Sequence, residues 1–137
     1  MTRIIVLDTE AVQALASPHH PKHHRVLGYV ELVERRKRHA APISVLAPTA
    51  VRVEAGWDRS SPRWAFLNRL RIVDVLLDAV CANKAAAIRE QAQVSVADAH
   101  IGATVQSAPD ADITVVTSDP EDIGRVSGGR QVTVVPI

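Results

Sequence analysis

The sequence of 137 residues is poor in cysteine and in aromatic residues. Cys81 is its one cysteine, so no disulfide can form within the chain. Aromatic residues make up 3% of the sequence, which leaves few rings on which the bases of a single strand could stack. The most apolar stretch, residues 72–87, is interrupted by Asp74, Asp78 and Lys84, whereas a membrane-spanning helix needs about 20 mostly apolar residues. These deficits exclude a disulfide scaffold and a transmembrane protein.

The sequence also lacks a glycine-rich phosphate loop and a linker. Gly128 and Gly129 follow a predicted helix instead of opening one. No repeat, low-complexity tract or loop-rich segment divides the chain, so we expect a single domain over residues 1–137, large enough to bury its own core. The apolar run after Met1 is too short for a signal-peptide core, which favours a cytoplasmic protein.

Charge is balanced overall but not along the chain. The formal net charge is +1, yet residues 1–75 hold 12 Lys or Arg against 7 Asp or Glu, and residues 76–137 hold 4 against 8. A basic half and an acidic half are compatible with an anionic polymer on one surface and cations on another. With so few aromatic rings, any nucleic acid would be held mainly through its phosphates.

Short apolar runs alternate with stretches of helical spacing. The runs that predict strands cover residues 4–7, 43–46, 72–75, 113–116 and 132–135. Helices are predicted over residues 10–16, 26–38, 48–57, 62–70, 78–91, 95–107 and 120–126. Residues 19–24, with four histidines and a proline, predict an exposed polar loop. Strands separated by helices indicate an α/β fold with a mostly parallel sheet covered on both faces.

Four acidic residues fall where such a fold places ligands, at the carboxyl ends of its strands. Asp8 ends the first strand and Asp119 follows the fourth. Glu54 and Asp98 are on helices that can lean over the same edge. All four have apolar or small neighbours, where an unpaired carboxylate is costly, and a shared divalent cation would remove that cost.

Each acid also has a purely structural interpretation. Asp8 can cap the first helix, Asp98 completes a capping box with Ser95, and Asp119 is an N-cap before Pro120. Glu54 can be a solvated helix residue. Capping alone does not account for acids at the ends of two strands together with two more in mostly apolar helices, which favours the metal-site hypothesis.

At these positions the sequence resembles the PIN domain family, and within it the VapC-like toxins of prokaryotic toxin–antitoxin pairs. The resemblance runs from Ile4 to Val135. Four segments carry it: IIVLDT at residues 4–9, VEA at 53–55, VADAHIGA at 96–103 and VVTSD at 115–119. Two features depart from the usual pattern: Glu10 adds an acid, and residues 120–123 lack the aromatic found in many relatives.

The resemblance implies a three-layer α/β/α sandwich around a short, mostly parallel five-stranded sheet, and a metal-dependent endoribonuclease. It implies that Asp8, Glu54, Asp98 and Asp119 form the catalytic metal site, with Thr117 and Ser118 as supporting hydroxyls. Hard oxygen ligands favour Mg²⁺ or Mn²⁺ over zinc. The expected partners are an RNA substrate, a cognate antitoxin and a second copy of the chain, with no membrane.

Two basic segments and two other function classes complete the sequence-based hypotheses. Arg35, Arg36, Lys37 and Arg38 form a solvated helix end or an RNA-binding patch. The histidine segment at residues 19–24 is interpreted as an exposed loop rather than a metal site, because Pro18 before it and Pro21 within it argue against a regular helix. A non-catalytic PIN-like module that binds RNA or protein remains the alternative. A response-regulator-like protein is disfavoured, since no lysine follows Val115.

Overall fold

The computed structural model describes residues 2–36, 43–108 and 111–137. Its strands are β1 (Thr2–Leu7), β2 (Ile43–Pro48), β3 (Ile72–Val75), β4 (Ala111–Thr117) and β5 (Thr133–Pro136). Its helices are α1 (Thr9–Ala16), α2 (His23–Arg36), α3 (Thr49–Ala55), α4 (Ala65–Arg69), α5 (Ala79–Ala92), α6 (Val96–Ser107) and α7 (Pro120–Val126), with a 3₁₀ turn, η1 (Pro62–Trp64). None of the helices in these ranges is long and apolar enough to cross a bilayer.

The five strands form one parallel sheet in the order β3-β2-β1-β4-β5. β1 lies at its centre, where Leu7 pairs in register with Val116 of β4 and Val6 with Leu46 of β2. Because both faces of a parallel sheet are covered, its strands are continuous aliphatic runs and not alternating ones. The chain moves toward β3 first and then crosses β1 to reach β4 and β5, so the switch point lies between β1 and β4, where ligands bind in such sheets.

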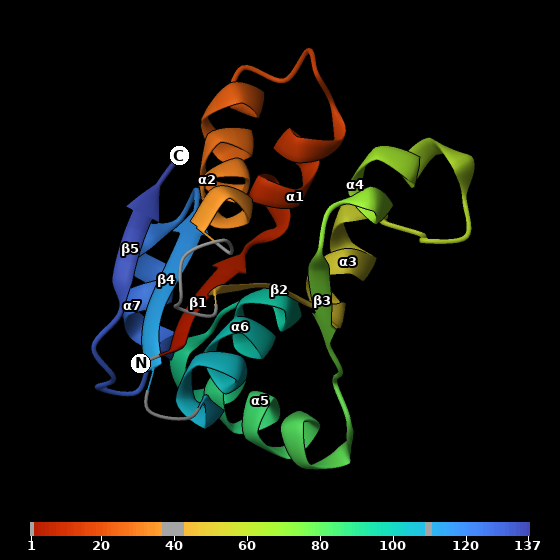
Figure 1. Ribbon diagram of the computed structural model, residues 1–137. Coiled ribbons are helices and arrows are strands. Elements are labelled where there is room, and N and C mark those ends of the chain that lie inside the picture. Colours follow the sequence, from red (N-terminus) through yellow and green to blue (C-terminus); the bar gives the residue numbers. More distant parts are fainter. Residues whose placement is uncertain (1, 37–42, 109–110) are drawn as a thin grey trace.

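Helices cover both faces of the sheet, which confirms the predicted three-layer α/β/α sandwich. On one face α1 contacts α2, α3 and α4; on the other α6 contacts α5 and α7 (Figure 1). Right-handed crossovers require this division, because the connections before β3 and after β3 run in opposite directions along the sheet. α3 and α6 belong to different layers but contact each other beyond the end of β2.

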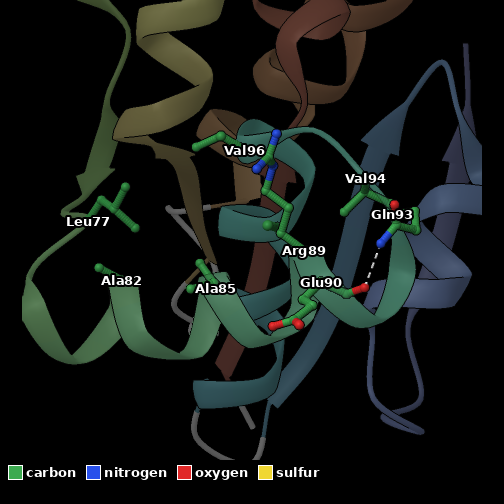
Figure 2. A pocket seen from close by; sticks show the side chains of 10 residues that line it. Leu77, Ala82, Ala85, Arg89, Glu90, Gln93, Val94 and Val96 are labelled. Atoms are coloured by element: carbon green, nitrogen blue, oxygen red, sulfur yellow. Dashed lines mark hydrogen bonds between the residues drawn. The ribbon is translucent and has the colours of Figure 1, made fainter.

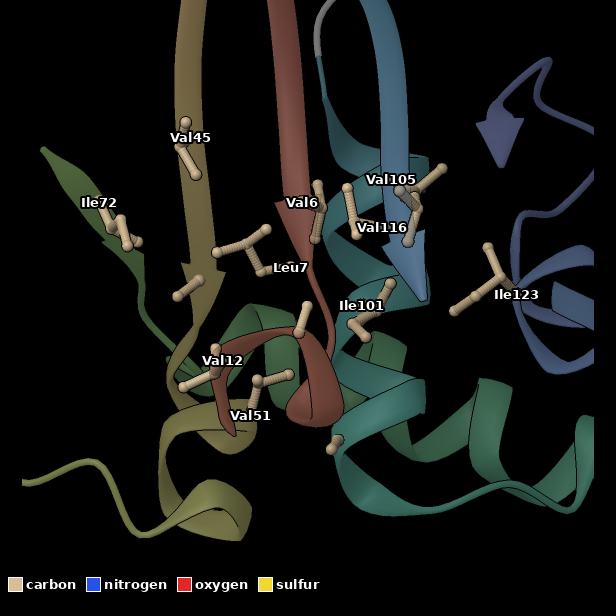
Figure 3. Close-up of a cluster of buried hydrophobic side chains, with 14 of the residues drawn as sticks. Val6, Leu7, Val12, Val45, Val51, Ile72, Ile101, Val105, Val116 and Ile123 are labelled. Carbon is tan, nitrogen blue, oxygen red and sulfur yellow. The ribbon is translucent and has the colours of Figure 1, made fainter. Parts of the chain in front are cut away.

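The core is aliphatic and continuous through the sheet. Figure 3 shows Val12 of α1 and Ile101 of α6 approaching the central strand residues Val6 and Leu7 from the two helical layers. All four side chains are fully buried. This core fixes the positions of the strand ends and of the helices that follow them.

Three local predictions were wrong. Pro48 does not open the helix predicted over residues 48–57: it is the last residue of β2, where it pairs with Val75, and α3 begins at Thr49. Proline is tolerated there because the last residue of a strand need not donate a backbone hydrogen bond to its neighbour. The predicted helix over 62–70 splits into η1 and α4, and Ser61 makes no side-chain cap. The histidine segment is not all loop: α2 begins at His23, whose buried ring donates from Nδ1 to the Ala14 carbonyl oxygen at 2.8 Å.

Candidate functional site

Asp8 is a buried carboxylate held at the end of the central strand. Its Oδ1 accepts a hydrogen bond from the Ala11 backbone N at 2.8 Å, which caps α1. Its Oδ2 accepts from the Ser118 backbone N at 2.9 Å, with the Ser118 hydroxyl 3.5 Å away. Only 5% of Asp8 is exposed. The capping interpretation is therefore confirmed, and the same carboxylate also joins the ends of β1 and β4.

Asp119 lies two residues after the end of β4, the strand that pairs with β1. Its Oδ1 accepts from the Asp122 backbone N at 3.3 Å, so it caps α7 as its place before Pro120 predicts. Its own backbone N donates to the Oγ1 of the fully buried Thr117 at 2.9 Å. Thr117 thus supports the turn that carries Asp119, while Ser118 supports Asp8.

Asp98 comes from the first turn of α6 and is half-buried. The Ser95 hydroxyl accepts from the Asp98 backbone N at 3.1 Å, which forms the Ser95 half of the predicted capping box. Burial raises the pKa of the Asp98 carboxyl above that of an ordinary aspartate, and the negative charges of Asp8, Asp119 and Glu54 raise it further against an opposing hydrogen bond from Ser95. The four acids therefore interact electrostatically.

Glu54 is in the last turn of α3 and is exposed. Nothing in the described ranges forms a hydrogen bond or an ion pair with its carboxylate. Two residues earlier, Arg52 binds Asp74 of β3 at 2.8 Å, and Arg59 binds the other oxygen of Asp74 at 2.9 Å. This ion-paired group ties the C-terminal half of α3 to the edge strand and leaves Glu54 free to face the sheet end.

The four predicted acids line a single cavity of about 310 Å³ at the carboxyl edge of the sheet. Glu10 and Ser118 line it as well. Glu10 is paired with Lys22 at 2.9 Å, and His20 lies 3.7 Å from the same oxygen. The hydrogen bond from Lys22 lowers the pKa of Glu10 despite partial burial, so this fifth acid carries its own counter-charge.

Two larger cavities beside this one are mainly aliphatic. One, of about 700 Å³, lies along α5 and the start of α6 and is shown in Figure 2 with Leu77 and Val96 at its border. A second, of about 440 Å³, joins Leu77 and Val96 to Val53 and Glu54. Neither gathers several titratable side chains as the carboxylate cavity does, so size does not identify the chemically equipped site.

The remaining sequence-based candidates fall into three groups. Asp122, an acid in the first turn of α7, forms an ion pair with Arg125 and does not line the carboxylate cavity. Arg35 and Arg36 end α2, their side chains are not among those described, and Lys37 and Arg38 lie outside the described residues. The RNA-binding patch at these four residues stays a prediction.

The donor set of the carboxylate cavity fits a hard divalent cation. Five carboxylates and the Ser118 hydroxyl line the cavity, and cysteine and histidine do not. Oxygen ligands of this kind are typical of magnesium and manganese sites. In the described part of the chain, no three His, Cys, Asp or Glu side chains already form a ligand shell. Mutual repulsion keeps carboxylates apart without a counter-charge, and Glu54 is exposed with no hydrogen bond or ion pair in the described ranges, so its side chain can turn inward.

No family model matches the sequence, and no curated protein is similar enough to match it. Solved structures do match over nearly the whole chain. One is FitAB bound to an IR36 DNA fragment, with 19% identity, a TM-score of 0.58 and coverage of 96% of this chain and 94% of that one. FitAcB from Neisseria gonorrhoeae matches with 21% identity, a TM-score of 0.54 and 96% of both chains.

VapBC2 from Rickettsia felis, bound to a DNA fragment from its promoter, matches with 14% identity and a TM-score of 0.59 over 96% of this chain and 98% of that one. At these identities the likeness concerns the fold. It agrees with the resemblance drawn from the four sequence segments, and it spans almost all of each matched chain. The protein therefore has the PIN-like fold of the VapC-type proteins that its sequence resembles.

Proposed function

We propose that this protein is a metal-dependent endoribonuclease and the toxin of a type II toxin–antitoxin pair. One observation carries the proposal: Asp8, Glu54, Asp98 and Asp119, which come from four separate segments of the chain, line one cavity at the switch point of the sheet. Capping accounts for the places of Asp8 and Asp119 but not for the approach of two helix-borne acids to the same cavity.

Each residue has a distinct part in this proposal. Asp8, Asp98 and Asp119 would hold Mg²⁺ or Mn²⁺, with Glu54 completing the set from the outer side. A bound cation of this kind lowers the pKa of water and neutralises charge on a phosphodiester. Ser118 and Thr117 keep the strand-end carboxylates in place through the hydrogen bonds described above. RNA is the proposed substrate because the sequence resembles the VapC-like PIN proteins, whose activity is metal-dependent cleavage of RNA.

The toxin assignment rests on the sequence resemblance together with the fold. Two of the matched structures, FitAB and VapBC2, are bound to DNA fragments. Because the sequence resembles the VapC-like toxins of toxin–antitoxin pairs, we propose that this chain acts with a second protein, a cognate antitoxin.

A second copy of the chain is the other proposed partner. We give the name aliphatic patch to five exposed residues that border two neighbouring cavities: Val53, Leu77 and Val96 line one, and Leu76 and Val80 line the other. Val53 and Val80 are 82% and 80% exposed. Leu77, Val53 and Val96 line one cavity beside Glu54. Exposed aliphatic groups of this kind mark interaction sites. An uncharged patch is complementary to itself, as a two-fold symmetric interface requires.

The alternative is a PIN-like module that binds RNA or a protein without cleaving it. An intact set of acids disfavours it, since binding an anionic polymer beside five carboxylates is electrostatically unfavourable without cations.

A cleavage assay with matched carboxylate variants tests the nuclease proposal. Purified protein should degrade RNA with added Mg²⁺ or Mn²⁺, and a chelator should stop the reaction. Asp8→Asn should lose activity by a factor of at least about 100, whereas Asp112→Asn, which alters an exposed carboxylate at the opposite end of the sheet, should not. Binding without cleavage by the wild-type protein under all metal conditions would favour the non-catalytic module.

A further inference from the structure

His100 is a fully buried histidine in α6 that the proposed chemistry does not use. Its Nδ1 accepts a hydrogen bond from the Ala50 backbone N of α3 at 3.2 Å. An accepting Nδ1 places the proton of the neutral ring on Nε2. Nε2 is buried and has no hydrogen-bond partner in the described part of the chain. The buried ring thus takes part in a single hydrogen bond, and that bond connects two helices.

That bond supplies something that α3 lacks. The N-cap position of α3 is Pro48, which forms no side-chain cap, and Ala50 is the second residue of the helix. The first amides of a helix have no partner within the helix and are ordinarily capped by a neighbouring side chain. For Ala50 the acceptor comes instead from His100 of α6, 50 residues away in sequence. His100 is therefore a cap provided by tertiary structure.

The helices it joins carry the two acids that no strand positions. Asp8 and Asp119 follow adjacent strands β1 and β4, and the Ser118 backbone binds Asp8 directly. Glu54 is on α3 and Asp98 on α6, which belong to different layers. In the described ranges, the bond that Ala50 N donates to the His100 side chain is the one hydrogen bond involving a side chain that links α3 with α6. Glu54 lies one helical turn after Ala50, on the same side of α3.

We infer that His100 is a positioning residue: by capping α3 from α6, it sets Glu54 against Asp98 at the carboxylate cavity. The inference rests on the proposed metal-binding function of that cavity. His100 does not line the cavity, so it would act through the place of α3 and not as a ligand.

The cap itself is tested on metal-free protein by NMR. With ¹⁵N labelling, His100 should show the Nε2–H tautomer and a coupling across the hydrogen bond to the Ala50 amide nitrogen. His100→Leu should speed hydrogen exchange at Ala50 more than in α5, and His100→Asn, whose Oδ1 can replace Nδ1 as acceptor, should restore protection. The Nδ1–H tautomer, or unchanged exchange at Ala50 in His100→Leu, would overturn the inference.

The effect on the site is tested by titrating Mn²⁺ alone into the same variants, followed by calorimetry. His100→Leu should bind Mn²⁺ about tenfold more weakly, the scale of losses seen when a group supporting a metal ligand is removed. His100→Asn should recover most of the affinity. In a Glu54→Gln background, His100→Leu should cause no further loss, because its effect passes through Glu54.

Thr104→Val is the matched control within α6. Thr104 is buried and donates its hydroxyl to the His100 carbonyl oxygen, so its loss perturbs α6 without touching α3. It should leave the Mn²⁺ affinity unchanged. If His100→Leu weakened Mn²⁺ binding equally in the wild-type and the Glu54→Gln backgrounds, the positioning role would be overturned, but the metal site would stand. Failure of the wild-type protein to bind Mn²⁺ would overturn the proposed metal site, and the positioning role with it, while the NMR result would still report on the cap.

Discussion

At the scale of single residues, Asp8 and Asp98 line the same cavity but differ in what surrounds their carboxylates. Asp8 accepts hydrogen bonds from two backbone amides, Ala11 N and Ser118 N. Donors of this kind stabilise a buried carboxylate. The pKa of Asp98 is raised by burial and by Asp8, so its charge is unfavourable in the metal-free fold. The Asp8 carboxylate is therefore accounted for both by capping and by the proposed metal site, whereas the unfavourable charge of Asp98 is accounted for by the proposed metal site.

The pH dependence of metal-free stability should reveal Asp98. Because its pKa is higher in the folded than in the unfolded chain, the folded state binds more protons, and the free energy of unfolding falls as pH rises through that raised pKa. Asp98→Asn should flatten this part of the curve and leave stability at neutral pH unchanged or higher. Urea unfolding with a chelator, at a series of pH values, measures both.

Asp8→Asn is the matched comparison for that experiment. It should be less stable than the wild type by about 1–2 kcal/mol, since one carboxamide oxygen cannot serve both backbone donors. A loss of about 1 kcal/mol in Asp98→Asn at neutral pH would instead show that Asp98 acts chiefly as a helix-start carboxylate, and its assignment to the metal site would be withdrawn.

At the scale of elements, close packing of helices places the site. α6 contacts α3, α5 and α7, and Gly102 marks its contact with α7. A Cβ at Gly102 would lie 2.7 Å from the Val126 carbonyl oxygen, so the two helices approach more closely than any side chain allows. The glycine in the segment VADAHIGA is thus a packing requirement and not a hinge.

Gly102→Ala should therefore destabilise the protein by roughly 1–3 kcal/mol, the cost of overpacking, although alanine has the higher helix propensity. Gly28→Ala in α2 is the control, because a Cβ there meets nothing within 4 Å and should be neutral or stabilising. Thermal and urea unfolding measure both variants. A stabilised Gly102→Ala would mean that α6 and α7 are further apart than described.

At the scale of the whole molecule, the acids and the aliphatic patch lie side by side. Glu54 lines the carboxylate cavity and also the aliphatic cavity of Val53, Leu77 and Val96. An interface formed over the patch would therefore border the proposed active site.

Val80→Glu tests the patch through the oligomeric state. The protein should sediment as a dimer at micromolar concentration, and a charge at this 80% exposed position should yield monomers without loss of fold. Leu32→Glu in α2, a similar change at a 46% exposed position outside the patch, should remain dimeric. A monomeric wild-type protein, or a dimer insensitive to Val80→Glu, would remove the second copy from the proposed partners.

The sequence by itself determined the elements, because each depends on local chemistry. Apolar runs of β-branched residues gave all five strands, and helical spacing with caps located α7 to the residue. It also pointed to four of the five acids that line the cavity: Asp8 and Asp119 follow apolar strand runs, and Glu54 and Asp98 lie in helical segments that carry the family resemblance.

The tertiary structure decided what depends on residues far apart in the chain. His23 reads as part of a polar loop, yet α1 supplies the carbonyl that pairs with it in the interior. Nothing in the sequence around Ala50 indicates a cap, yet the His100 side chain from the other helical layer accepts a hydrogen bond from its backbone N. Such contacts leave no local pattern, because both partners are ordinary residues until the sheet brings their helices together. Packing also set the raised pKa of Asp98, which depends on charges from three other segments converging on one edge.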